Sequence, residues 1–161
     1  KVSEGQDFEV FVDYAHTEDA LRNLLSAAKE ISRGKIITVF GCGGERDRGK
    51  RPKMGKVARD MSDIMIITSD NPRGEDPLVI IEEIETGISG LKRGTDYFVV
   101  EDRRSAIEMA VDLAMPGDTV ILAGKGHEDH QIIGGKRLHF DDREVAREAI
   151  RERPSRQRGK S

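Results

Sequence analysis

Four charged or glycine-rich segments could bind a small charged ligand. Each follows an apolar run that is typical of a buried strand, and together they are residues 13–17, 41–51, 70–73 and 124–128. Guanidinium groups bind carboxylates or phosphates through paired hydrogen bonds, and a carboxylate can bind an ammonium group. Because ligands lie at the carboxyl ends of parallel strands, we expect all four segments to meet at one edge of a sheet.

The second segment contains glycine patterns that resemble nucleotide-binding loops. Residues 44–50 have the spacing G-x4-G-K, but Arg51 stands where a P-loop has the hydroxyl that ligates Mg²⁺. Residues 41–43 hint at a dinucleotide-binding turn, but the third glycine of that motif is absent. We interpret both matches as coincidental, because a tight connection between a strand and a helix needs glycines anyway.

The same segment also concentrates positive charge. Its cationic side chains could bind a carboxylate or a phosphate, and they are Arg46, Arg48, Lys50 and Arg51. For Arg48 and Lys50 individually, a solvated surface charge is an equally good interpretation. Cys42 is best explained as a packed thiol beside a tight turn. Taken singly, the other three segments could be a helix cap, an ordinary turn and a flexible connection.

Short β-branched runs alternate with longer helical periods, a pattern typical of an α/β domain. Strands are expected at residues 8–13, 35–40, 63–68, 97–100 and 119–123, and helices at 18–32, 52–61, from 77, 105–114 and 144–152. Residues 131–133 and 137–139 flank Gly134 and Gly135 as a hairpin. We predict a mainly parallel, Rossmann-like sheet flanked by helices in a domain of residues 1–153, followed by a mobile basic tail of residues 154–161.

Composition excludes several classes of function. The chain of 161 residues has a formal net charge of −3, 4% aromatic residues and no Trp, so we expect no nucleic-acid partner. No apolar run approaches a membrane span, and no targeting segment follows the N-terminus, which reads as a chain entered partway. With Cys42 as its lone cysteine, the protein is expected to be cytoplasmic and free of internal disulfides. We also expect it to be a monomer.

The order and spacing of five motifs carry more information than any one of them. They are DYAHT at 13–17, FGCGGERD at 40–47, DNPR at 70–73, AGKGHE at 123–128 and FDDRE at 140–144. Over residues 5–152 the chain resembles the C-terminal domain of Mur ligases. Within that family, the resemblance is to the UDP-N-acetylmuramoyl-tripeptide synthetases. The resemblance implies two further domains, one for the UDP-sugar and one central ATPase, that this chain does not contain.

The resemblance also implies which residues bind the amino acid that the ligase adds. Asn71 and Arg73 would hold the distal carboxylate of meso-diaminopimelate. Glu128 and the Gly124 carbonyl would hold its distal ammonium, and Arg46 would engage the carboxylate beside the reacting amine. L-Lysine has the ammonium but no distal carboxylate, so a lysine-adding ligase is the second hypothesis.

By the same resemblance, Asp13 and His16 would contact the nucleotide across a domain closure. Glu18 departs from the family pattern, in which proline is frequent at this position; this affects the helix start and not the contact residues. ATP and Mg²⁺ would be bound mainly by the central domain. No residue of this chain is therefore expected to be catalytic or to bind a metal.

The implied reaction of the complete ligase is ATP-dependent amide formation during peptidoglycan synthesis. It would join meso-diaminopimelate to UDP-MurNAc-L-Ala-D-Glu, and the domain itself would be inactive. A non-catalytic module that binds an amino acid or a nucleotide stays open as an alternative, as does a scaffold that has lost catalysis.

Overall fold

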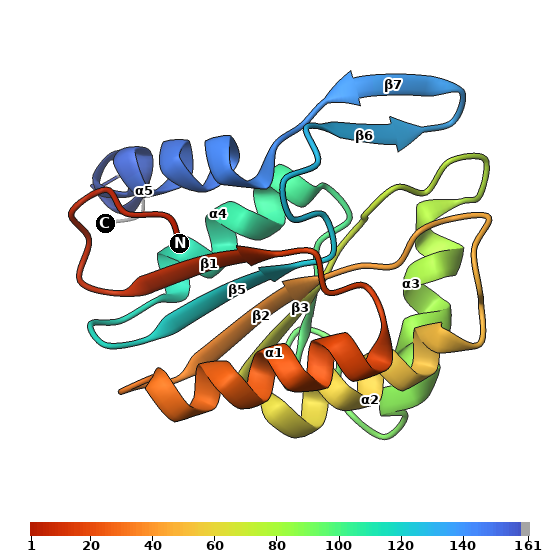
Figure 1. The fold of residues 1–161 in the computed structure, drawn as a ribbon, viewed down its shortest axis with the longest axis horizontal. Helices are drawn as coiled ribbons and strands as arrows, with labels where there is room; N and C mark the ends of the chain where they lie inside the picture. The colour runs from red at the N-terminus through yellow and green to blue at the C-terminus, as the bar shows by residue number, and fades with distance from the viewer. Residues whose placement is uncertain (159–161) are drawn as a thin grey trace.

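The computed structural model describes residues 1–158, which form a three-layer α/β domain (Figure 1). Five parallel strands make one sheet in the order β1-β5-β2-β3-β4. Their bounds are Glu9–Asp13, Ile36–Phe40, Ile64–Ile67, Phe98–Val99 and Thr119–Ala123 for β1 to β5. A separate antiparallel hairpin joins β6 (His130–Ile133) to β7 (Lys136–His139). The predicted fold class is confirmed.

Helices cover both faces of the sheet. One face carries α1 (Glu18–Ile31), α2 (Lys50–Met61) and α3 (Pro77–Glu85), which a short 3-10 turn, η1 (Thr86–Ile88), follows. The other face carries α4 (Arg103–Leu113) and α5 (Asp142–Arg158) (Figure 1). In β2, Ile36 and Phe40 pack into the first core while Ile37 and Val39 pack into the second. The period of two along a strand buried on both faces thus builds two apolar cores.

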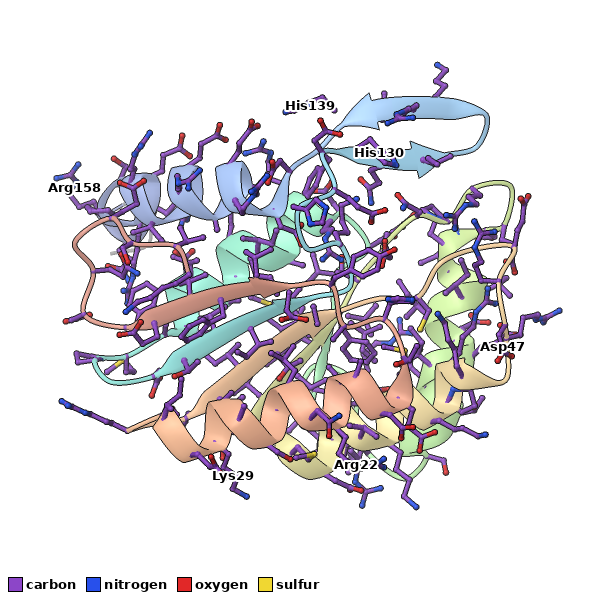
Figure 2. All side chains as sticks on the ribbon, in the orientation of Figure 1. Arg22, Lys29, Asp47, His130, His139 and Arg158 are labelled. Atoms are coloured by element: carbon purple, nitrogen blue, oxygen red, sulfur yellow. The ribbon has the colours of Figure 1, made fainter. Side chains whose placement is uncertain are left out.

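Local sequence sets most helix starts. Thr17 caps α1, Asp76 caps α3 ahead of Pro77, and Asp102 caps α4, each accepting a backbone N–H. Helix α1 buries Leu21, Leu25 and Ala28. Figure 2 shows Arg22 and Lys29 on its outer side, away from the sheet.

Several expected boundaries are wrong. Helices α2, α4 and α5 begin two residues earlier than expected, at Lys50, Arg103 and Asp142, and α5 continues through Pro154 to Arg158. Residues 154–158 were expected in a mobile tail, but they are helical because Arg156 bonds Asp112 (2.8 Å) and the Ala149 carbonyl (2.6 Å). The rest of the predicted tail, residues 159–161, lies outside the described residues. None of the helices described is both long and apolar enough to cross a membrane.

Candidate functional site

The four segments singled out by their charge and glycines meet at the carboxyl edge of the sheet. They surround a cleft of about 480 Å³. Six of the seven predicted site residues line it: His16, Arg46, Asn71, Arg73, Gly124 and Glu128. The cleft is also lined by Tyr14, Thr17, Gly43, Asp47, Lys50 and Asp70. Cations from the loops after β2 and β3 therefore line the same small cleft as several acidic side chains.

Arg73 is held by its backbone so that its guanidinium lines the cleft. Its φ of 53° is in the left-handed region, which non-glycine residues avoid and which is often found at functional sites. Its N–H donates to the Ile132 carbonyl (2.9 Å), and Nη1 donates to the Gly44 carbonyl (2.9 Å). Among residues 1–158, Nε and Nη2 have no hydrogen-bond partner, which leaves one edge of the guanidinium to grip a carboxylate.

Asn71 is buried with its amide in a defined orientation. Its Oδ1 accepts the N–H of Ile132 at 2.9 Å, which ties the loop after β3 to the hairpin. The Nδ2 group is then the part of this side chain that can donate to a ligand. Asn71 therefore has a structural role that its place in the predicted site did not suggest, and it can still act as a donor.

Acidic groups also line the cleft. Glu128 is half-buried, and its N–H bonds the Lys125 carbonyl (2.9 Å). Gly124 has a φ of 118°, and a Cβ there would lie 2.7 Å from Oδ2 of Asp70. Glycine is favoured here because other residues rarely adopt this φ, and the loop after β5 passes close to the Asp70 carboxylate.

Asp70 is a site residue that sequence reasoning missed, because Asp-Asn-Pro also suits an ordinary turn. Its side chain lines the cleft although the residue is only 7% exposed. Burial raises the pKa of its carboxyl, while the charges of Arg103 and Lys125 oppose that rise. Within the described residues, no group hydrogen-bonds to this carboxylate, so it is a buried acceptor facing the cleft. Its position three residues after the end of the apolar strand β3 was the available signal.

Lys125 supports the loop from below. It is fully buried, burial lowers its pKa, and its ammonium donates to the His130 carbonyl at the start of β6. The side chain thus joins the 124–128 loop to the hairpin. Lys125 therefore helps to set the conformation of this loop.

The four cations that follow β2 have different surroundings in the structure. Arg46 is exposed and lines the cleft, with Nη1 bonded to the adjacent Glu45 carbonyl (3.0 Å). Lys50 also lines it and donates to the His16 carbonyl (2.9 Å). Arg48 is exposed and bonds Glu83, outside the residues that line the cleft.

The hypothesis that Arg51 binds a ligand is wrong. Its side chain is fully buried, and it donates to Glu75 (2.9 Å), to Glu83 and to the Gly43 carbonyl (2.9 Å). Glu75 in turn accepts the N–H of Glu45. Arg51 therefore links the loops after β2 and β3 from beneath the cleft and has no free edge for a substrate.

This Arg51 cluster makes stability depend on pH. Hydrogen bonds from Arg51 are the largest cause that lowers the Glu75 pKa from 4.5 to about 2. A carboxyl with a depressed folded-state pKa stabilises the fold above its unfolded pKa, and this contribution is lost as pH falls through the folded pKa. We therefore expect Glu75→Gln to lower the unfolding temperature most at neutral pH. The gap to the wild type should shrink between pH 4.5 and about 2, as measured by thermal melts of the chain.

Glu82→Gln on the exposed side of α3 is the matched control, and it should leave the melts nearly unchanged. An equally large gap for Glu75→Gln at pH 2 and pH 7 would show that its charge is not what stabilises the cluster.

The two residues predicted to contact a nucleotide lie near each other after β1. Asp13 is exposed, does not line the cleft, and accepts the Ala15 N–H through Oδ1 (2.9 Å). His16 lines the cleft, and its ring contacts that of Tyr14 edge-on at 4.6 Å between centroids. The Asp13 oxygen Oδ2 is the one that could accept a hydroxyl.

Comparisons with known proteins identify similar chains. The model of the family described as "Mur ligase, glutamate ligase domain" matches residues 1–126. A UDP-N-acetylmuramoyl-L-alanyl-D-glutamate--2,6-diaminopimelate ligase of Trichormus variabilis is 54% identical over 153 residues, which are 95% of this chain and 30% of that protein. The ligase of the same name from Clostridium botulinum is 54% identical over 145 residues, 90% of this chain and 29% of that protein.

Solved structures agree. A structure of a ligase with this same name superposes with a TM-score of 0.87 at 42% identity, covering 96% of this chain and 31% of that one. The chain thus spans about 30% of the length of the relatives that it matches.

Proposed function

The chain belongs to the Mur ligase family, and we propose that it is the amino-acid-binding domain of a ligase that joins meso-diaminopimelate to UDP-MurNAc-L-Ala-D-Glu. One observation carries this proposal: Arg73 and Glu128, which come from two separate strand ends, line the same cleft. The distal end of meso-diaminopimelate is a zwitterion that requires such a pair. A half-buried guanidinium and an acidic side chain together complement both of its charges.

The acidic part of the cleft strengthens the assignment. Asp70 and Glu128 both line it, beside the backbone of Gly124. The Asp70 carboxylate has no hydrogen-bond donor among residues 1–158, so a donor from a ligand in the cleft could pair with it. An ammonium group from the substrate would supply up to three donors. We therefore add Asp70 to the groups proposed to bind the distal ammonium, with Asn71 Nδ2 and Arg73 on the carboxylate.

In this proposal the domain positions the substrate and does not activate it. Arg46, at the exposed side of the cleft, would hold the carboxylate next to the reacting amine. Fixing an amine in line with its electrophile accelerates a reaction by removing the entropy of encounter. Asp13 and His16 would meet the nucleotide when the ligase closes.

ATP and Mg²⁺ would be held mainly by the part of the ligase outside this chain. Among residues 1–158, no group of three His, Cys, Asp or Glu side chains is placed to hold a metal ion. The loop at 44–51 lacks the hydroxyl of a P-loop, and its Arg51 is committed to Glu75. A monomeric state and a cytoplasmic location complete the proposal.

The test is ATP-dependent amide formation by the full-length ligase that carries this domain. With UDP-MurNAc-L-Ala-D-Glu, meso-diaminopimelate and ATP, we expect a new amide product and stoichiometric release of phosphate. The 161-residue chain alone should hydrolyse ATP no faster than the buffer. Turnover by the chain alone would contradict the proposed division of labour, and a full-length enzyme inactive with meso-diaminopimelate would contradict the substrate.

A further inference from the structure

Arg103 is a fully buried arginine that lies behind the cleft and does not line it. It is the first residue of α4. Nε and Nη2 donate to the two carboxylate oxygens of Asp142, at 2.8 and 2.7 Å. Asp142 is itself fully buried and is the first residue of α5. This is a paired, planar contact between the starts of two helices.

Arg103 also donates to two backbone carbonyls, one shortly after β3 and one at the end of β5. Nη1 donates to the Ser69 carbonyl at 3.0 Å, and Nη2 donates to the Ala123 carbonyl at 3.3 Å. Ser69 immediately precedes Asp70, and Ala123 immediately precedes Gly124. The loop that carries Asp70 and Arg73 and the loop that carries Glu128 therefore both begin beside a carbonyl bound by one guanidinium.

From this geometry we propose that Arg103, held by Asp142, is a positioning residue for the amino-acid site. It sets the separation between the loop that carries Arg73 and the loop that carries Glu128. This separation determines which spacing of carboxylate and ammonium in a substrate fits between them. This inference rests on the proposed function. Arg103 touches no substrate and acts only through the two loops.

Stability alone is a weak reason for such a pair. Burying two charges costs desolvation energy that their attraction barely repays, and well-packed apolar replacements are often as stable. A guanidinium nevertheless does what an apolar side chain cannot, because its fork donates to two carbonyls and a carboxylate in one plane. The charge of Arg103 also opposes the rise in the pKa of the Asp70 carboxyl that burial causes. Both effects act on the cleft.

The experiment compares three variants of the full-length ligase. Arg103→Met with Asp142→Asn removes both charges, so neither is left buried without a partner. Arg103→Lys keeps the charge but loses the planar fork. Arg104→Met is the matched control, because Arg104 is the next residue of α4 and makes an exposed ion pair with Glu148 at 2.7 Å. The KM values for meso-diaminopimelate, UDP-MurNAc-L-Ala-D-Glu and ATP are measured with kcat and the melting temperature.

We expect the double variant to raise the KM for meso-diaminopimelate by about tenfold to a hundredfold, because displacements of about 1 Å at a site cost that much. The KM values for the other two substrates should change less than about twofold, since those substrates bind mainly outside this chain. The KM of Arg103→Lys for meso-diaminopimelate should fall between those of the wild type and the double variant. The KM of Arg104→Met should match that of the wild type.

Two results would overturn the inference. One is an unchanged KM for meso-diaminopimelate in a folded variant. The other is a parallel rise in all three KM values that follows the loss of melting temperature, which a purely structural role would produce. If the double variant does not fold, Arg103→Lys decides by the same two criteria. A wild-type enzyme that does not use meso-diaminopimelate would instead refute the proposed function, and this inference with it.

Discussion

Replacing Arg73 with alanine in the full-length ligase is expected to raise the KM for meso-diaminopimelate by a factor of about 30 to several thousand. This range corresponds to the loss of about 2–5 kcal/mol for a broken charge pair. The loss falls on binding, because Arg73 is proposed to hold the end of the substrate far from the reacting amine. The fold should survive. The hydrogen bonds that anchor residue 73 to Ile132 and Gly134 use its backbone N–H and carbonyl.

Steady-state kinetics with varied meso-diaminopimelate provide the measurement. Arg73→Lys keeps the charge without the fork and should lie between the wild type and Arg73→Ala. Arg137→Ala is a matched control, because Arg137 is an exposed arginine of β7, in the hairpin that the backbone of Arg73 contacts. An Arg73→Ala enzyme with the wild-type KM would remove Arg73 from the site and leave the cleft without its main cation.

Selectivity for meso-diaminopimelate over L-lysine is expected to be the largest effect, about 10⁴–10⁵ in kcat/KM, as for sites built to bind a polar group that the competitor lacks. Lysine would bring an ammonium to Asp70 and Glu128 but no carboxylate to Arg73 and Asn71. The free guanidinium edge of Arg73 and the Asn71 amide would then be desolvated without a partner.

Competition between the two amino acids in one assay measures this ratio directly. Arg73→Ala should reduce it sharply, because that variant loses activity with meso-diaminopimelate while activity with lysine changes little. Comparable kcat/KM values for the two substrates in the wild type would favour the lysine-adding hypothesis. Such a result would also imply that the cations of the cleft serve another anion.

Both expectations depend on the hairpin and on its contacts with the loop after β3, and the sequence reveals the hairpin but not the contacts. The hairpin at residues 130–139 was predictable from two β-branched or alternating segments around Gly134 and Gly135. What the sequence did not reveal is that this hairpin bonds the loop after β3. Asn71 Oδ1 accepts from Ile132, and the Gln131 amide donates to the Asp70 carbonyl at 2.8 Å. Contacts between segments about 60 residues apart leave no local pattern.

The sequence by itself determined the elements and the edge at which their loops meet. Helix caps such as Thr17 and Asp76, the period of two in β2, and strand ends that carry charge are local properties. Short-range sterics and hydrogen bonds set them. Once the sheet is parallel, the loops after its strands must share one edge.

Only the tertiary structure decided which charged residue does what. Arg46 and Arg51 are five residues apart in one loop and helix start, yet one lines the cleft and the other is buried against Glu75. Arg103 and Asp142 precede the two helices expected from the sequence, and only the fold places their side chains 2.7 Å apart. The physical reason is that the role of a charge depends on its burial and on its partners, and those partners come from distant segments of the chain.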